Sequence, residues 1–252
     1  MIILKSPREI ELMREAGKRL AFVHRGAREL LKPGMSTWEL DQAIAKLIKD
    51  QGGIPSFLNY QGFPACSCIS VNDTVIHGIP SKDEIIREGD IVSLDLGLIY
   101  EGYHADAART LCVGEVKDET KRLVQVTRES FFEGLAFCRE GYRLSDVSHA
   151  IQTHCENNGF SVVREFTGHG IGKDLHEDPS IPNYGEPGRG PRLRAGMVLA
   201  IEPMVNQGDK AIRMEADGWT IKTIDGKPSA HYEHTVLITG DDPELFTWGD
   251  EV

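Results

Sequence analysis

"REGDIVSLD" at residues 87–95 and "RAGMVLAIE" at residues 194–202 are two versions of one segment. Each has an arginine, a glycine two residues later, a largely apolar run and a final carboxylate. Asp95 therefore corresponds to Glu202, at an offset of 107 residues. Short apolar runs of this kind are typical of strands that are buried on both faces. The segment predicts two buried strands, each of which ends in an acid.

The same offset aligns the sequence upstream of each strand. "KPGMSTWELDQAIAKLIKDQGG" (32–53) falls on "REGYRLSDVSHAIQTHCENNGF" (139–160), with Gly34, Ala43, Ile44 and Gly52 matched by identical residues. Both stretches have apolar residues at helical spacing, and both end at glycine. We therefore expect one α+β domain over residues 1–252, built from two similar halves of about 1–115 and 116–252, and not a solenoid of many repeats.

A second pair of acids repeats as well. "HAD" (104–106) recurs as "HYE" (231–233), so that Asp106 corresponds to Glu233. The run "IVSLDLGLIY" (91–100), the dipeptide "EG" and the run "YHADAARTL" (103–111) together predict a hairpin with a two-residue turn. In that register Asp95 faces Ala108, and Asp106 is its diagonal neighbour, with Cβ atoms roughly 7–8 Å apart.

Residues 196–205 and 230–238 offer the second pair of strands, which carry Glu202 and Glu233. One carboxylate in such a strand is more readily explained as a surface residue or as the partner of an Arg or Lys. Four carboxylates placed alike in both halves would be very unfavourable among apolar residues unless they were paired or bound to metal. The repetition favours a hydrolase site with two divalent cations about 3.5–4 Å apart.

The glycine-rich stretch "TGHGIGKDLHEDP" (167–179) contains His169 and His176. It matches neither a phosphate-binding loop nor a dinucleotide-binding turn, and the chain has no H-E-x-x-H helix. Two solvent-exposed histidines in a mobile loop are the plainest alternative. Beside four carboxylates, a histidine ligand that completes an oxygen-rich site is the better interpretation.

Composition narrows the class of protein. Lys and Arg number 28 against 39 Asp and Glu, and the net charge of −11 argues against direct binding of nucleic acid. No apolar run is long enough for a membrane span, and the N-terminus lacks the apolar core of a signal peptide. The five cysteines form no C-x-x-C pair, which favours reduced thiols in the cytoplasm.

The chain resembles the type I methionine aminopeptidases, of the family that also contains prolidase, aminopeptidase P and creatinase. The resemblance spans nearly the whole sequence. It is carried by "HGIP" (77–80), "DIVSLDLG", "GYHADAART", "GHGIGKDLHEDP", "AIEPMV" and "YEHTVLIT". It implies the pita-bread fold, with two related halves around a central dimetal site. It also implies removal of the initiator methionine from nascent chains when the second residue is small.

The resemblance implies a role for each acid and for three histidines. Asp95 would chelate one metal, and Asp106 and Glu233 would bridge both. His169 and Glu202 would complete the second metal's shell, with Glu202 also the general base that activates water. His77 and His176 would donate hydrogen bonds to the scissile peptide and to the developing oxyanion. The glycines between the histidines would let the backbone pass close to substrate.

Five residues resemble the walls of the methionine pocket: Tyr60, Phe63, Cys68, Leu175 and Trp219. Leu175 and Phe63 differ from the residues common at their positions, and Gly97 stands where a threonine often sits near the metal. These departures affect pocket shape and metal preference. Asn72, Thr74 and Ser229 resemble a monovalent-cation site of some members. His104 and His231 share strand faces with the ligands, and we assign them no role.

The expected function is therefore that of a cytoplasmic, monomeric methionyl aminopeptidase with two divalent ions, acting on nascent chains at the ribosome. Cobalt, manganese, iron and zinc all suit such a site. The first alternative is an Xaa-Pro peptidase of the same fold, and the second is a binding module that keeps the fold without catalysis. The complete ligand set argues against the module.

Overall fold

The computed structural model describes residues 1–249; the last three residues of the expected second half lie outside this range. Its helices are α1 (Pro7–Leu30), α2 (Thr37–Asp50), α3 (Asp118–Leu135) and α4 (Leu144–Asn157). Ser6 and Ser36 begin α1 and α2, because each hydroxyl accepts from the amide of a glutamate three residues on, which reciprocates. Both ends of α4 lie 107 residues after those of α2, as the sequence repeat predicts.

The longest strands form the expected hairpin, β4 (Ile91–Tyr100) and β5 (Tyr103–Cys112). Glu101 and Gly102 both have positive φ, 48° and 81°, as in a type I′ turn. Asp95 pairs with Ala108 and Gly97 with Asp106, so the predicted register is confirmed. Apart from Asp95 and its two last residues, β4 is buried, as its apolar sequence indicates.

The remaining strands are short. Together with the hairpin they form four sheets in the described part of the chain. β1 (Ile54–Pro55) and β2 (Ser67–Val71) flank β4. A five-stranded sheet has the order β15-β14-β9-β7-β8, from β7 (Thr167–Gly170), β8 (Glu177–Pro182), β9 (Val198–Ile201), β14 (His234–Leu237) and β15 (Glu244–Leu245). A third contains β6 (Ser161–Val162), β10 (Met204–Asn206) and β13 (Ser229–His231). The last contains β3 (Thr74–Ile76), β11 (Ile212–Met214) and β12 (Ile221–Thr223).

The second pair of acid-bearing strands is interrupted, which the sequence did not lead us to expect. Residues 196–205 form β9 and β10 with Glu202 between them, and residues 230–238 form β13 and β14 with Glu233 between them. β9 pairs with β14 while β10 pairs with β13, so both acids lie where the pairing is broken. The Glu233 amide instead donates to the Ala108 carbonyl of β5, at 2.9 Å.

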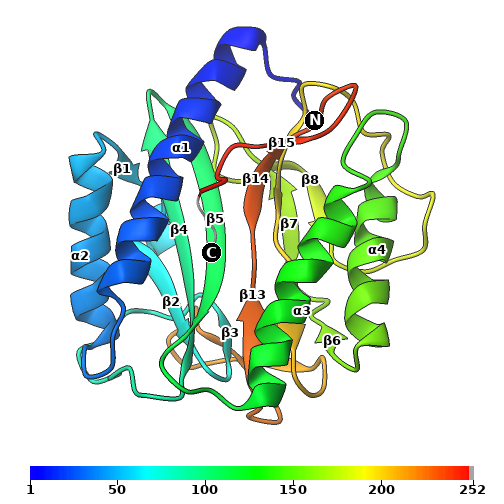
Figure 1. Ribbon diagram of the computed structural model, residues 1–252. Helices are drawn as coiled ribbons and strands as arrows, with labels where there is room; N and C mark the ends of the chain where they lie inside the picture. Colours follow the sequence, from blue (N-terminus) through cyan, green and yellow to red (C-terminus); the bar gives the residue numbers. More distant parts are fainter. Residues whose placement is uncertain (250–252) are drawn as a thin grey trace.

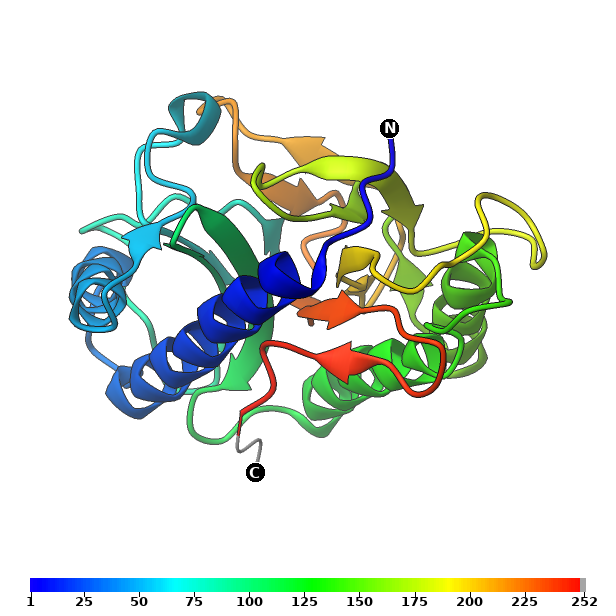
Figure 2. The ribbon, with the colours of Figure 1, turned by 90° about the horizontal axis from the view of Figure 1, so that it is seen from above.

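β5 joins the two halves of the chain. The Asp106 amide donates to Thr235 Oγ1 at 2.9 Å, and the same hydroxyl donates to the Asp106 carbonyl. Thr110 makes the equivalent pair of bonds to the backbone of His231. Figure 1 shows β13 and β14 running beside β5 between the two helix pairs. In Figure 2 helices α1 to α4 lie on one side, and β7, β8 and the β11–β12 hairpin lie on the other, as does the short 3-10 helix η1 (Tyr60–Gly62).

Residues 167–170 of the glycine-rich stretch belong to β7 and residues 177–179 belong to β8, and the short loop between them carries His176. A Cβ on Gly168 would collide with the Ala200 carbonyl oxygen, and one on Gly170 with that of Asp178. Gly168 and Gly170 therefore allow the close approach of neighbouring protein backbone. Within residues 1–249 no helix has the length and apolar character needed to cross a bilayer.

Candidate metal centre

The structure brings every predicted metal, catalytic and pocket residue to one cavity of about 270 Å³. The acids and histidines at this cavity are Asp95, Asp106, Glu202, Glu233, His77, His169 and His176. The predicted pocket residues that line it are Tyr60, Phe63, Cys68, Leu175 and Trp219. Residues more than 170 positions apart in the chain thus meet because β5 lies against β13 and β14.

Three of these side chains are close enough to share one ion. Potential ligand atoms of Asp106, His169 and Glu233 all lie within 4.8 Å of one another. Glu202 Oε1 lies 3.5 Å from His169 Nε2, so this acid adjoins the same cluster. Asp95 reaches the cavity from β4, diagonal to Asp106 in the hairpin.

Several of the carboxylate oxygens have no protein partner. Asp95 Oδ1, Asp106 Oδ1 and Glu233 Oε1 are fully buried and accept no hydrogen bond from residues 1–249. A buried charged oxygen without a partner is very costly. Oxygen and imidazole donors of this kind suit a divalent cation, so the residues present fit a metal.

The pKa values of the four carboxyl groups also indicate that a cation belongs in this cluster. Burial, reinforced by the neighbouring acids, raises the pKa of Asp95, Glu202 and Glu233 well above their usual range. Burial also raises the pKa of Asp106 to about 7. Four crowded, buried carboxyl groups therefore retain protons unless positive charge enters the cluster. A divalent cation would supply that charge.

His169 has the tautomer that a metal ligand requires. Its Nδ1 lies 2.9 Å from the Gly170 carbonyl, which can only accept, so Nδ1 carries the proton. Burial, together with nearby His176, lowers the pKa of His169 to about 3. The ring is therefore neutral at physiological pH, and the lone pair of Nε2 points to the acid cluster.

His176 and His77 line the same cavity as the proposed ligands. The Tyr60 hydroxyl lies 2.7 Å from His176 Nδ1, a contact that the sequence did not indicate. Burial lowers the pKa of His176, and burial together with His176 lowers that of His77 to about 4. His77 also has a φ of 57°, a strained conformation for a non-glycine residue that costs about 1–3 kcal/mol. Such strain is common where a side chain must be aimed at a site.

The rest of the cavity is lined by the predicted pocket residues and by residues that the sequence did not indicate. The rings of Phe63 and Trp219 meet edge to face, with centroids 5.2 Å apart. Cys68 and Leu175 are buried beside them. The missed lining residues are Phe57, Gln61, Ile76, Phe166 and Thr167. They belong to short segments without periodicity, so no sequence signal marked them.

Phe57 explains the glycine at position 97. A Cβ on Gly97 would lie 2.7 Å from the Phe57 ring and 2.7 Å from Ser56 Cβ. The space of the expected threonine is thus filled by a neighbouring segment. The hydroxyl of Ser56 lies 2.9 Å from His104 Nδ1, and this hydrogen bond fixes the His104 ring beside the same segment.

Two further features surround the site. Lys5 and Glu177 form a buried ion pair that fixes the N-terminal segment beside His176, and no motif pointed to it. Asn72 and Ser229 lie together, since the Ser229 amide donates to the Asn72 carbonyl at 2.9 Å. The Asn72 side chain binds Asp90 and the Ile91 amide. Neither residue, nor Thr74 on β3, lines the metal-centre cavity.

Comparisons with known proteins agree with this geometry. Residues 11–240 match the model of metallopeptidase family M24, and the chain belongs to that family. It has the pita-bread fold that methionine aminopeptidases and prolidases share.

Among the most similar relatives is methionine aminopeptidase 1 of Bacillus subtilis, 54% identical over 95% of this chain and 96% of that protein. The methionine aminopeptidase of Clostridium perfringens is 53% identical over 98% of this chain and 99% of its own. The crystal structure of methionine aminopeptidase from Thermotoga maritima has a TM-score of 0.97 at 46% identity, and the match covers 99% of this chain and 100% of that one. Prolidase from Pyrococcus furiosus matches at a TM-score of 0.81 and 24% identity, over 66% of its length, and shows the fold alone.

Proposed function

We propose that the chain is a metal-dependent aminopeptidase that removes N-terminal methionine from polypeptides whose second residue is small. The observation that carries this proposal is the convergence of four acids and His169 beside a closed apolar pocket. The most similar relatives are named methionine aminopeptidases, which supports methionine as the N-terminal residue of the substrate. The Xaa-Pro alternative has only the shared fold in its favour, because the prolidase matches are distant.

Two divalent ions would be held by five side chains. Asp106 and Glu233, each with one buried oxygen that lacks a partner within the described chain, are assigned as ligands of both ions. Asp95 completes one set of ligands, and His169 and Glu202 complete the other. Cobalt, manganese, iron or zinc would satisfy this mixture of oxygen and nitrogen donors.

The residues of the chain would position the peptide and move one proton. When bound, divalent ions supply Lewis acidity that brings the pKa of a coordinated water towards neutrality. Glu202, with Oε1 at the ligand cluster, takes a proton from the attacking water and delivers it to the leaving amine. This proton transfer requires a carboxylate at position 202.

His176 and His77 would stabilise the reacting carbonyl. A Tyr60 hydroxyl that donates to Nδ1 leaves the proton of the neutral His176 ring on Nε2, which can then donate to the oxyanion. His77 lines the same cavity and, with its lowered pKa, is also a neutral donor. We assign it to the scissile peptide.

The methionine side chain would enter the pocket formed by Tyr60, Phe63, Cys68, Leu175 and Trp219. An unbranched thioether fills an irregular apolar space well and makes favourable contacts with aromatic rings. The ring pair of Phe63 and Trp219 supplies such contacts. A monovalent cation near Asn72, Thr74 and Ser229 would lie outside this cavity.

The proposal extends to where the enzyme acts and in what form. N-termini of nascent chains would be processed at the ribosome, in the cytoplasm, by a monomer in which residues 1–252 act as one catalytic domain. With a net charge of −11, the chain is not expected to bind RNA directly.

A peptide panel tests the specificity. We expect fast cleavage of Met-Ala-Ser and Met-Gly-Ser and little or no cleavage of Met-Lys-Ser, Met-Phe-Ser or Ala-Pro-Ser by the metal-loaded enzyme. Leucine in place of methionine should lower kcat/KM by about 10- to 200-fold, the usual discrimination of an apolar pocket. Cleavage of Ala-Pro-Ser without a preference for methionine would establish the Xaa-Pro alternative instead.

A further inference from the structure

His231 is a buried histidine beside the metal centre to which the proposed function gives no part. It is the last residue of β13 and stands two residues before Glu233. Its side chain is 2% exposed, and neither ring nitrogen has a hydrogen-bond partner within residues 1–249. A buried imidazole without a partner is unfavourable, so its polar edge is expected to serve a group that the site brings close.

The ring of His231 faces the carboxyl group of Glu202. His231 Nε2 lies 3.8 Å from Glu202 Oε2, which is about 1 Å longer than a normal N–H···O hydrogen bond. The other oxygen, Oε1, lies 3.5 Å from His169 Nε2, at the ligand cluster. The two oxygens of Glu202 are thus divided between the proposed metal ligands and His231.

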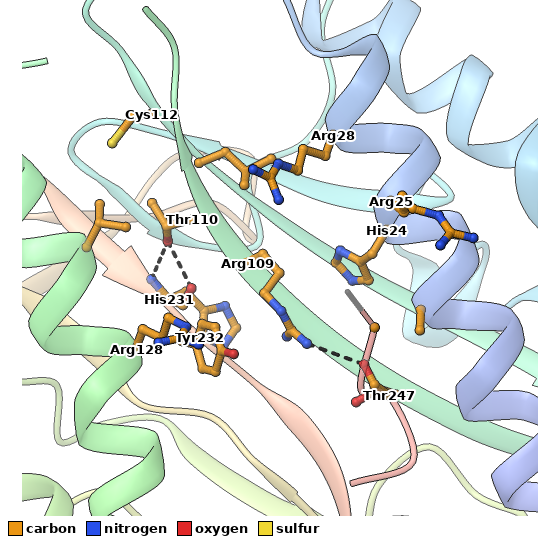
Figure 3. Close-up of a pocket in the computed structure, with 14 residues that line it drawn as sticks. His24, Arg25, Arg28, Arg109, Thr110, Cys112, Arg128, His231, Tyr232 and Thr247 are labelled. Carbon is orange, nitrogen blue, oxygen red and sulfur yellow. Dashed lines mark hydrogen bonds between the residues drawn. The ribbon is translucent and has the colours of Figure 1, made fainter. Parts of the chain in front are cut away.

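The backbone of His231 is held firmly in this place. The Thr110 hydroxyl accepts from the His231 amide at 2.8 Å and donates to the His231 carbonyl at 2.9 Å (Figure 3). His231 also pairs with Met204 of β10, a strand that begins two residues after Glu202. His231 lines in addition a separate cavity of about 500 Å³ between α1, β5 and α3, whose described lining residues include no Asp or Glu. The carboxyl group that the ring meets therefore lies on the side of the metal centre.

The sequence repeat supplies a contrast to His231. His104 stands two residues before Asp106, as His231 stands two residues before Glu233. The His104 ring already has a partner, because its Nδ1 lies 2.9 Å from the Ser56 hydroxyl. The two equivalent histidines therefore differ in their bonding. His231 is the one whose ring remains available to an acid of the site.

We propose that His231 is a positioning residue for Glu202, and that its Nε2 donates a hydrogen bond to the Glu202 carboxylate in the metal-loaded enzyme. This inference rests on the proposed function, in which Glu202 is both a metal ligand and the general base. A donor on Oε2 fixes the plane of the carboxylate, so that Oε1 keeps its place at the ligand cluster. Residues that orient a ligating group in this way typically contribute about 10–100-fold to metal affinity or activity.

The tautomer of His231 tests the contact without any measurement of activity. A neutral imidazole carries its proton on only one nitrogen, and a pH of about 8 lies above the usual histidine pKa. NMR of zinc-loaded protein with nitrogen-15 in its histidines would show which nitrogen carries the proton, and the signal that His231→Gln removes belongs to this ring. We expect the proton on Nε2. A proton on Nδ1 would exclude donation to Glu202 and overturn the proposal.

Two substitutions separate the hydrogen bond from packing. His231→Leu removes the donor at similar volume, whereas His231→Gln keeps an N–H donor of similar reach. At saturating metal we expect the leucine variant to lose about 10–100-fold in kcat on Met-Ala-Ser with little change in KM, and the glutamine variant to recover most of that loss. Bound metal would be measured on each sample. His154→Leu is the matched control, since His154 lies on α4 and lines neither cavity.

The results separate this role from the proposed function. A leucine variant with the kcat of the natural sequence, or an equal loss of kcat in both variants, would overturn the positioning role. The tautomer measurement on the natural sequence decides the contact even where the leucine variant does not fold. If the metal-loaded natural sequence did not hydrolyse Met-Ala-Ser, the proposed function would fail, and the tautomer would still show whether His231 donates to Glu202.

Discussion

Asp106 is the residue on which the proposed metal centre is expected to depend most. Thr235 holds its backbone from both sides, which fixes the direction of the side chain. Its Oδ1 is buried without a partner in the described chain, and burial raises its pKa to about 7. A side chain that is so firmly held and so poorly solvated is prepared to bind a cation and is costly without one.

The raised pKa values predict that metal binding releases protons. Without metal, Asp106 keeps its proton up to about pH 7, and burial beside the other acids raises the pKa of Asp95, Glu202 and Glu233 well above their usual range. His169 contributes none, because its pKa is about 3. Calorimetry of metal binding in buffers of different ionisation enthalpy should show proton release at pH 6 that declines as pH rises. Buffer-independent heats at pH 6 would contradict the carboxyl assignments.

Glu202 is proposed both as a metal ligand and as the general base, and one variant tests the second role when bound metal is measured as well. Glu202→Gln keeps the shape and one ligand oxygen but cannot accept a proton. We expect kcat on Met-Ala-Ser to fall by about 10²–10⁴-fold, the usual contribution of a general base. Metal content must be measured on the same sample. A fully metallated variant with near-normal kcat would remove Glu202 from the proton-transfer step.

At the scale of elements, β7 is the strand whose sequence is least like a strand. Gly168 and Gly170 lower its intrinsic preference for β structure, yet both are needed because the backbones of β8 and β9 come so close. The same closeness places His169, which lies between these glycines, at the acid cluster. The glycines therefore serve the position of the ligand.

A substitution of one glycine tests this explanation. Gly168→Ala places a Cβ against the Ala200 carbonyl and should destabilise the fold by about 1–3 kcal/mol. Gly240→Ala is the control, since nothing lies within 4 Å of its added Cβ. Urea unfolding of the metal-free proteins would measure both. Equal transition midpoints for the two variants would show that the space around Gly168 is not restrictive.

Local patterns predicted some elements well and others not at all. The β4–β5 hairpin and its register were predictable, because the Glu101–Gly102 turn and the apolar runs are local signals. The breaks at Glu202 and Glu233 were not, because they depend on tertiary contacts: Glu233 pairs with Ala108 of β5, and the Glu202 carbonyl accepts from the side chain of Asn183. The contact of Tyr60 with His176 and the packing of Phe57 against Gly97 depend likewise on tertiary structure. For the site, the repeat indicated the acids, whereas the histidine and pocket roles came from the family resemblance.

At the scale of the whole molecule, the proposed metal centre lies where the two halves of the chain meet. Asp95 and Asp106 come from the β4–β5 hairpin, His169 comes from β7, and Glu202 and Glu233 come from the segments that follow β9 and β13. Neither half supplies the complete ligand set. Bound metal should therefore stabilise the joined state of both halves, in addition to enabling catalysis.

The central claim is that this junction is a metal-dependent methionine aminopeptidase centre. The most direct measurement titrates manganese or cobalt into metal-free protein while the hydrolysis of Met-Ala-Ser and the bound metal are both followed, with Asp106→Asn alongside. We predict no hydrolysis without metal, activity that rises with metal up to two ions per chain, and a variant that loses at least one ion and nearly all activity. Full activity in metal-free protein, or no hydrolysis of Met-Ala-Ser by protein loaded with two ions, would contradict the account.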